Sequence, residues 1–517
     1  MTTLTGKRLE LRARYQAARS RLAPPDPVNV FVFAAFAWAL LCFFLVTGGQ
    51  RFAYQIARLG SSETVFNILL INQTDIAWVM IAGLVGLAAA FFILGRYRWL
   101  SIGAFLIAMN FSGSLWRPLH DLAFGVKYLA IVYLACSSFL FFYRNGWRLI
   151  DTKGYRLLCA YLAWVGFITA YNGLAIGDLW FLSTEFCLML GFGVVWLGEI
   201  NDAAQLRKLN FTVAFAAVVV TFCHLLAPLV YPEFTQQGRF VSTMERATGF
   251  AVPYSPFVVA LFWASMYDKS AYLQRVFTVL AFIGFGLILW SGTRNATFAT
   301  LIGVFGVWWV FRTKLLVYIV AAGIVALLVQ IFVGNTQDLV QLGDRLSSTT
   351  NNRSEVWELY LELAMERPLL GYGFEGLRGA IYGESLVEAI GNIVRLSIPS
   401  AHNHYLGVLV RFGVVGLLLN LLIIGAPLLR AWRVIFSPLV HASDKKLYVL
   451  PAALLLVVAL EGLFEDSVGS GGKGSLHGLI FALGVPVVYL YGGHLLDAAA
   501  ARSTLANAGP EPSRSSA

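Results

Sequence analysis

Charged residues are scarce in this chain of 517 residues: they make up 13% of it, whereas hydrophobic residues make up 58%. A soluble globular protein has roughly 25% charged and about 45–50% apolar residues. A soluble chain of this length would need several domains with polar surfaces, and the composition does not supply them. The sequence therefore excludes a soluble enzyme and a disordered protein, and it predicts that most of the chain lies in a lipid bilayer.

Cysteine is also rare, with five residues in the whole chain. The five cysteines form no CxxC pair or other metal-binding spacing, and all of them fall within apolar segments. We interpret them as small core residues, which excludes a disulfide-rich secreted scaffold. We also expect no cleavable signal peptide, because the first apolar segment is long and has no small-residue cleavage site.

Long apolar segments, in contrast, are frequent along the chain. Each is about long enough to cross a bilayer of ~30 Å at 1.5 Å per residue. They predict an all-α, polytopic integral membrane protein with about 12–14 transmembrane helices. The expected spans are 28–47, 76–95, 99–116, 122–143, 157–174, 181–199, 210–231, 251–267, 276–290, 295–311, 315–333, 405–429, 447–463 and 475–491.

The net charge of +10 is better explained by membrane topology than by a nucleic-acid partner. With the N-terminus inside, most Lys and Arg residues fall on inner segments and most Asp and Glu residues on outer ones, as the positive-inside rule requires. The expected divisions are a basic cytoplasmic N-terminus (1–27), transmembrane helices 1–11 (28–333), a large, partly helical periplasmic loop (334–404), transmembrane helices 12–14 (405–491) and a disordered cytoplasmic tail (494–517).

The large outer loop contains one clear helical pattern. A helix is expected to begin near Arg353 and to end before Pro368. Its glutamates recur every three or four residues on one face, with apolar residues opposite. We interpret the acidic face as solvated rather than as a metal site. The acidic residues are Glu355, Glu358, Glu362 and Glu366, and the apolar ones are Val356, Trp357, Tyr360, Leu361, Leu363 and Ala364.

Four ionisable residues stand at predicted outer membrane boundaries: Arg246, Arg294, Arg353 and His402. A charge near the bilayer is unfavourable unless it is hydrated or paired, so such residues are candidates for function. A guanidinium is always protonated and offers a planar fork of donors that matches phosphate oxygens. The set therefore suits a lipid-linked phosphate or diphosphate. Simpler roles remain open: snorkelling for Arg294, an ion pair with nearby glutamates for Arg353, and a polar helix start for His402.

An ordered series of motifs contains these four residues, and it resembles the O-antigen ligase and Wzy-type polysaccharide polymerase family. The resemblance is concentrated in residues 240–420, about a third of the chain. The motifs are Arg246-x-x-Gly249-Phe250, Ser291-Gly-Thr-Arg294, Arg353-x3-Trp357, Glu366-Arg-Pro368-Leu-Leu-Gly371-Tyr-Gly373, and His402-Asn403-x-Tyr405-Leu406 continuing to Gly413-Val-Val-Gly416-Leu417.

The resemblance implies a membrane glycosyltransferase of the C type that faces the periplasm of the bacterial inner membrane and uses neither a metal nor another cofactor. Its donor would be a glycan on undecaprenyl diphosphate, and its acceptor a lipid-linked repeat unit or lipid A–core. Arg246, Arg294 and Arg353 would bind and stabilise the leaving diphosphate, and His402 would take a proton from the attacking hydroxyl. Membrane lipid and a chain-length regulator are further expected partners; nucleic acid is not.

Three functions remain open at this stage. The preferred one is a polymerase that joins lipid-linked repeat units of O-antigen or exopolysaccharide. The first alternative is an O-antigen ligase that transfers the glycan to lipid A–core or to a protein, with the same donor and the same four residues. A flippase for the lipid-linked oligosaccharide is less favoured, because it would need cationic groups along its pathway and related halves with broken helices.

Overall fold

The computed structural model describes residues 98–126, 153–172, 202–312, 353–381, 401–465 and 487–507, except 112, 117, 121, 124–125, 237, 245, 374–376 and 378–379. Helices predominate in these residues, and two short strands form an antiparallel hairpin. The expected spans 28–47, 76–95, 181–199 and 315–333, and most of 122–143 and 475–491, lie outside the described residues.

The helices follow the apolar segments of the sequence closely. Four of them, α9, α10, α11 and α18, are long and apolar enough to cross a membrane. The prediction of an all-α membrane protein is therefore confirmed. The elements are α5 (Arg98–Phe111), α7 (Lys153–Tyr171), α9 (Ala203–Val230), β1 (Thr235–Gln236), β2 (Arg239–Phe240), α10 (Ala247–Tyr267), α11 (Ala271–Ser291), α12 (Arg294–Phe311), α15 (Arg353–Glu366), α18 (His404–Phe436), α19 (Ala442–Glu461), the π-helix η3 (Val487–Tyr491) and α21 (Gly492–Asn507).

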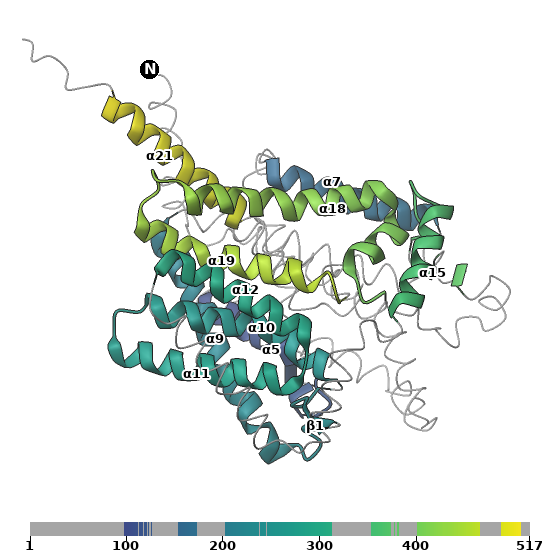
Figure 1. The fold of residues 1–517 in the computed structure, drawn as a ribbon, viewed down its shortest axis with the longest axis horizontal. Helices are drawn as coiled ribbons and strands as arrows, with labels where there is room; N and C mark the ends of the chain where they lie inside the picture. The colour runs from purple at the N-terminus through teal and green to yellow at the C-terminus, as the bar shows by residue number, and fades with distance from the viewer. Residues whose placement is uncertain are drawn as a thin grey trace, which may run out of the picture.

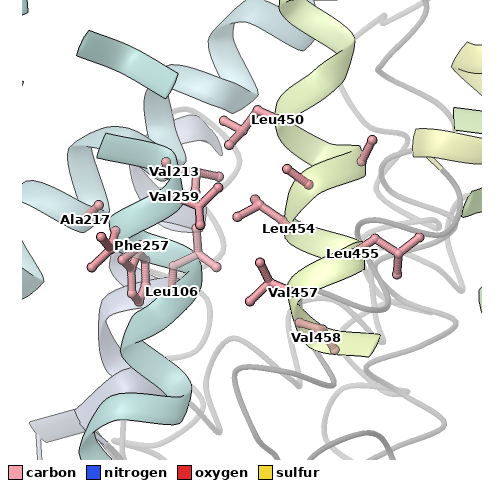
Figure 2. Packing of buried hydrophobic residues seen from close by; sticks show 14 of the residues in the cluster. Leu106, Val213, Ala217, Phe257, Val259, Leu450, Leu454, Leu455, Val457 and Val458 are labelled. Carbon is pink, nitrogen blue, oxygen red and sulfur yellow. The ribbon is translucent and has the colours of Figure 1, made fainter. Parts of the chain in front are cut away.

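Helix α10 forms the centre of the molecule and packs against α9, α11, α12 and α19 (Figure 1). Side chains are buried along most of this helix, and those of Trp263 and Tyr254 are fully buried. Figure 2 shows Leu454 and Val457 of α19 on the side of α10, the helix that carries Phe257 and Val259. Because lipid is as apolar as these side chains, the helices are held together by close packing rather than by exclusion of water.

Helix α18 lies beside α7 and is broken at Gly413, which has φ 69° and ψ −175° (Figure 1). The segment after α15 fills the break. The amide of Tyr372 donates to the carbonyl of Val410 at 3.0 Å, and the amide of Val414 donates to the carbonyl of Pro368 at 2.7 Å. These hydrogen bonds satisfy backbone groups that an interrupted helix would otherwise leave unpaired.

Two expectations are wrong in part. The tail from residue 494, expected to be disordered, is helical as far as Asn507, where α21 ends. Its run of alanines after Asp497 has the highest intrinsic helix propensity, which explains the difference. In α15, Leu361 was expected on the buried side but is 52% exposed, whereas Tyr360 and Leu363 are buried as expected.

Candidate functional site

The predicted site residues lie at one end of the helical bundle. The chain passes from α9 to α10 through the hairpin, and from α11 to α12 through a tight turn at the same end. The hydroxyl of Ser255, early in α10, donates to the buried carboxylate of Glu461 at the end of α19 at 2.5 Å. The start of α18 and the end of α19 therefore belong to this end of the bundle as well.

Arg294 is the first residue of α12 and is exposed. The turn before it is held by Arg239 of β2, whose Nε donates to the carbonyl of Ser291 at 2.6 Å and whose Nη2 lies 3.5 Å from Oγ1 of Thr293. Gly292 adopts the left-handed conformation, with φ 62°, and lies against the Arg239 guanidinium. A second arginine thus holds the turn that presents Arg294.

Arg246 is the N-cap residue of α10 and is also exposed. The segment before it is fixed by a buried polar cluster. Ser242 has a left-handed backbone, with φ 56°, and its hydroxyl hydrogen-bonds with Nδ1 of the fully buried His224 at 2.7 Å. Nε2 of His224 lies 3.1 Å from the side-chain amide of Asn110. Sequence reasoning missed this cluster, because His224 is one polar residue inside an apolar span.

Arg353 begins α15, as predicted, but its side chain lies outside the described part of the structure. The helix is anchored beyond it. Nε1 of Trp357 donates to the carbonyl of Ala401 at 2.7 Å. The hydroxyl of Tyr372 donates to Glu366, and burial together with this carboxylate raises the pKa of Tyr372 to about 12. The phenol therefore stays protonated and keeps the segment after α15 in place.

His402 lies just before α18 and not within it. Its φ of 46° places it in the left-handed region, and Asn403 caps the helix by accepting from the amide of Leu406 at 3.0 Å. His402 therefore precedes the helix, because a left-handed residue followed by an N-cap cannot continue a helix. The imidazole is about 39% exposed, so it is accessible from outside the protein.

His404, the neighbouring histidine, has a different environment. It is fully buried, its Nε2 lies 3.1 Å from Oδ1 of Asn420, and its amide donates to the carbonyl of Gly462 at 2.8 Å. It therefore joins the start of α18 to the end of α19, whereas His402 is directed elsewhere. Of the two histidines, only His402 is partly exposed.

Glu465 is a residue that sequence reasoning did not select. Its Oε2 lies 3.3 Å from Nδ1 of His402, and its own amide donates to the carbonyl of Glu461 at 2.9 Å. The signal that was present is the acidic run beginning at Glu465 on an expected outer segment. Nothing in the sequence pairs it with a histidine 63 positions earlier.

Three of the predicted site residues, Arg246, Arg294 and His402, thus lie at the same end of the bundle, each at or beside the start of a helix. The helix starts matter electrostatically, because the N-terminus of a helix carries a partial positive charge that adds to that of a guanidinium. The arrangement can hold an anion and can exchange a proton beside it.

Comparison with protein families gives one finding: residues 279–421 match the family described as O-Antigen ligase. The match contains Arg294, Arg353 and His402, whereas Arg246 and Glu465 lie outside it. A comparison with curated proteins gives no match. The family supports a polymerase or ligase role in general, and a lipid-linked glycan as the class of substrate. This match covers residues 279–421 of the 517-residue chain and supports the resemblance to the O-antigen ligase and Wzy-type family.

Proposed function

We propose that the protein is a polysaccharide polymerase that joins undecaprenyl-diphosphate-linked repeat units at the periplasmic face of the bacterial inner membrane. The observation that carries this proposal is the placement of two exposed arginines, Arg246 and Arg294, at the starts of α10 and α12, on the end of the bundle that also holds His402.

The two arginines would bind the diphosphate of the donor. Neither α10 nor α12 has a side-chain hydrogen bond from its N-cap residue. The positive ends of these two helices therefore act together with Arg246 and Arg294 on an anion at this surface. Arg353 completes the proposed set, since Trp357, one turn after it in α15, donates to the carbonyl of Ala401 beside His402. A lipid diphosphate fits because its tail can stay in the bilayer while its charge meets the arginines.

His402 would act as the general base. A hydroxyl of the acceptor sugar attacks the anomeric carbon of the donor and gives its proton to the imidazole. The new carbon–oxygen bond forms as the bond to the diphosphate oxygen breaks, and the electron pair leaves with the diphosphate. The arginines stabilise the charge that develops there, which is the main contribution that a site without a covalent intermediate can make.

A ligase is the second candidate, and the description of the matching family favours it. Polymerase and ligase share the donor, the arginines and the base, and they differ in the acceptor. We prefer the polymerase because two long expected outer segments, 48–75 and 334–404, offer room for two lipid-linked glycans.

Deletion of the gene, followed by analysis of the lipid-linked glycans that accumulate, separates these functions. A polymerase mutant accumulates single repeat units. A ligase mutant accumulates long chains that are not attached to an acceptor, which would replace the polymerase proposal by the ligase. Repeat units trapped on the cytoplasmic side would instead indicate a flippase and would contradict both.

The base is tested by complementation of the deletion with two histidine variants. We expect His402→Ala to lose about 10²–10⁴-fold in transfer rate while it still binds the donor. His404→Gln should retain the ability to hydrogen-bond with Asn420 and most of the activity. If the His402 variant transfers normally, or loses donor binding instead of turnover, the assignment of the base is wrong.

A further inference from the structure

The side chains of His402 and Glu465 are in contact, and the proposed function assigns no role to Glu465. The two residues are 63 positions apart and come from opposite sides of the α18–α19 pair: His402 precedes α18 and Glu465 follows α19. The Glu465 side chain is only 14% exposed, so its carboxylate faces the protein rather than solvent.

Both residues are held by the backbone around them. On the histidine side, Ala401 accepts from Trp357 of α15 and His404 donates to Gly462 beyond α19, so the chain is anchored on each side of His402. On the carboxylate side, the amide of Glu465 donates to the carbonyl of Glu461, which continues the last turn of α19. The contact is therefore built from two fixed segments rather than from two flexible surface side chains.

The left-handed backbone of His402 is the second observation. A non-glycine residue with φ 46° is sterically disfavoured, because its Cβ lies close to the following carbonyl oxygen. Such conformations persist where the surroundings impose them, and they gather at functional sites. Here the conformation lets the chain turn between Ala401 and the N-cap Asn403, and it directs the imidazole toward Glu465 instead of along α18.

The chemistry of the contact assigns the roles of the two ring nitrogens. An ionised carboxylate can only accept a hydrogen bond, so the proton of the neutral imidazole is on Nδ1. The lone pair that takes a proton is then on Nε2. When Nε2 becomes protonated, the nearby negative charge stabilises the imidazolium. This is how a carboxylate assists a histidine base without itself being protonated.

We infer that Glu465 is a positioning residue for the transfer reaction: its carboxylate fixes the tautomer and orientation of His402, so that Nε2 receives the proton of the acceptor hydroxyl. This inference rests on the proposed function, because it requires His402 to be the base. It also extends the site beyond the matched residues 279–421, to a segment after α19.

The test uses the full-length protein, purified and reconstituted with a lipid-linked glycan donor. Glu465→Gln keeps the size of the side chain, but its amide can donate to Nδ1 and stabilise the wrong tautomer. We expect it to lower kcat at least about tenfold, and by no more than the ~10²–10⁴-fold of the base itself, with KM for the donor unchanged. Glu465→Asp, which keeps the charge, should recover part of the loss. Glu362→Gln, an exposed glutamate of α15, is the matched control and should behave as wild type.

A double variant separates positioning from a structural role. If Glu465 acts only through His402, then Glu465→Gln has no further effect on the residual rate of His402→Ala. A further loss in that background would overturn the inference, as would a normal kcat of Glu465→Gln. A matching fall in melting temperature in both the Gln and Asp forms would assign Glu465 a structural role and also overturn it. An active His402→Ala protein would instead refute the proposed base, so the two failures are distinguishable.

Discussion

Gly413, at the break in α18, makes the most stringent test of how the fold positions the site. Its φ of 69° and ψ of −175° belong to a region that only glycine occupies readily. A Cβ at this position would overlap the backbone carbonyl of Leu369, which belongs to the segment that fills the break. The opposing Gly371 is also too tight for a side chain, because a Cβ there would lie 2.6 Å from the backbone carbon of Arg411. Gly413→Ala should therefore force these two segments apart.

The size of the effect follows from two contributions. A non-glycine residue in this backbone region is destabilising by roughly 1–3 kcal/mol. Overlap with backbone atoms, which cannot rotate away, adds about 1–3 kcal/mol, as in other overpacked interiors. The sum of about 2–6 kcal/mol is a large part of the stability of a typical domain. Because the same segment leads from α15 to the start of α18, transfer activity should fall together with stability.

The measurement is the thermal unfolding of the purified protein in detergent, with glycan transfer followed in parallel. Gly425→Ala is the matched control, because Gly425 lies in the same helix and a Cβ there meets nothing within 4 Å. That variant should be neutral or slightly stabilising, since alanine favours helix over glycine by up to ~1 kcal/mol. Equal melting temperatures for Gly413→Ala, Gly425→Ala and wild type would refute the proposed interlock.

Three further predictions concern the arginines and the topology. Transfer should be abolished by Arg246→Ala and by Arg294→Ala, while each variant protein remains in the membrane. The corresponding lysine variants should recover little activity if each guanidinium contacts phosphate through two donors. Fully active lysine variants would leave these positions only a general electrostatic role. Arg239→Ala should free the turn before Arg294 and lower the transfer rate, although by less than Arg294→Ala does. Arg275→Ala removes an exposed arginine at the other end of α11 and should leave the transfer rate unchanged. Equal transfer rates in the Arg239→Ala and Arg275→Ala variants would exclude a specific role for Arg239 in that turn. A single cysteine at position 362, introduced into a cysteine-free variant, should react with a membrane-impermeant maleimide in intact spheroplasts; labelling only by permeant reagents would reverse the expected orientation of residues 334–404.

The helices and the identity of the family domain could be predicted from the sequence, because both depend on local patterns. Apolar runs of transmembrane length specify α9, α10, α11 and α18 with no knowledge of their neighbours. The helix at Arg353 was predicted from the spacing of its glutamates and from Pro368 beyond it. Charge scarcity predicted the class of protein for the same reason: it is a property of composition and not of contacts.

The partners of the site residues could not be predicted, because they come from distant parts of the chain. Glu465 approaches His402 only because α18 and α19 pack side by side. Arg239 reaches the carbonyl of Ser291 across 52 positions, from a hairpin whose strands have two residues each and no strand-like pattern. The left-handed backbone of His402, which directs its imidazole toward Glu465, also leaves no mark in the sequence.

Three residues other than glycine have a left-handed backbone in the described part of the structure: Ser242, Arg312 and His402. Arg312 is the C-cap of α12, a place where a left-handed residue commonly ends a helix. Ser242 and His402 do not end helices. They lie at the end of the bundle that carries the arginines, and each is held by a hydrogen bond to a buried neighbour or by anchors on adjacent residues. Such held positions are expected if this end must keep side chains in fixed positions for a substrate.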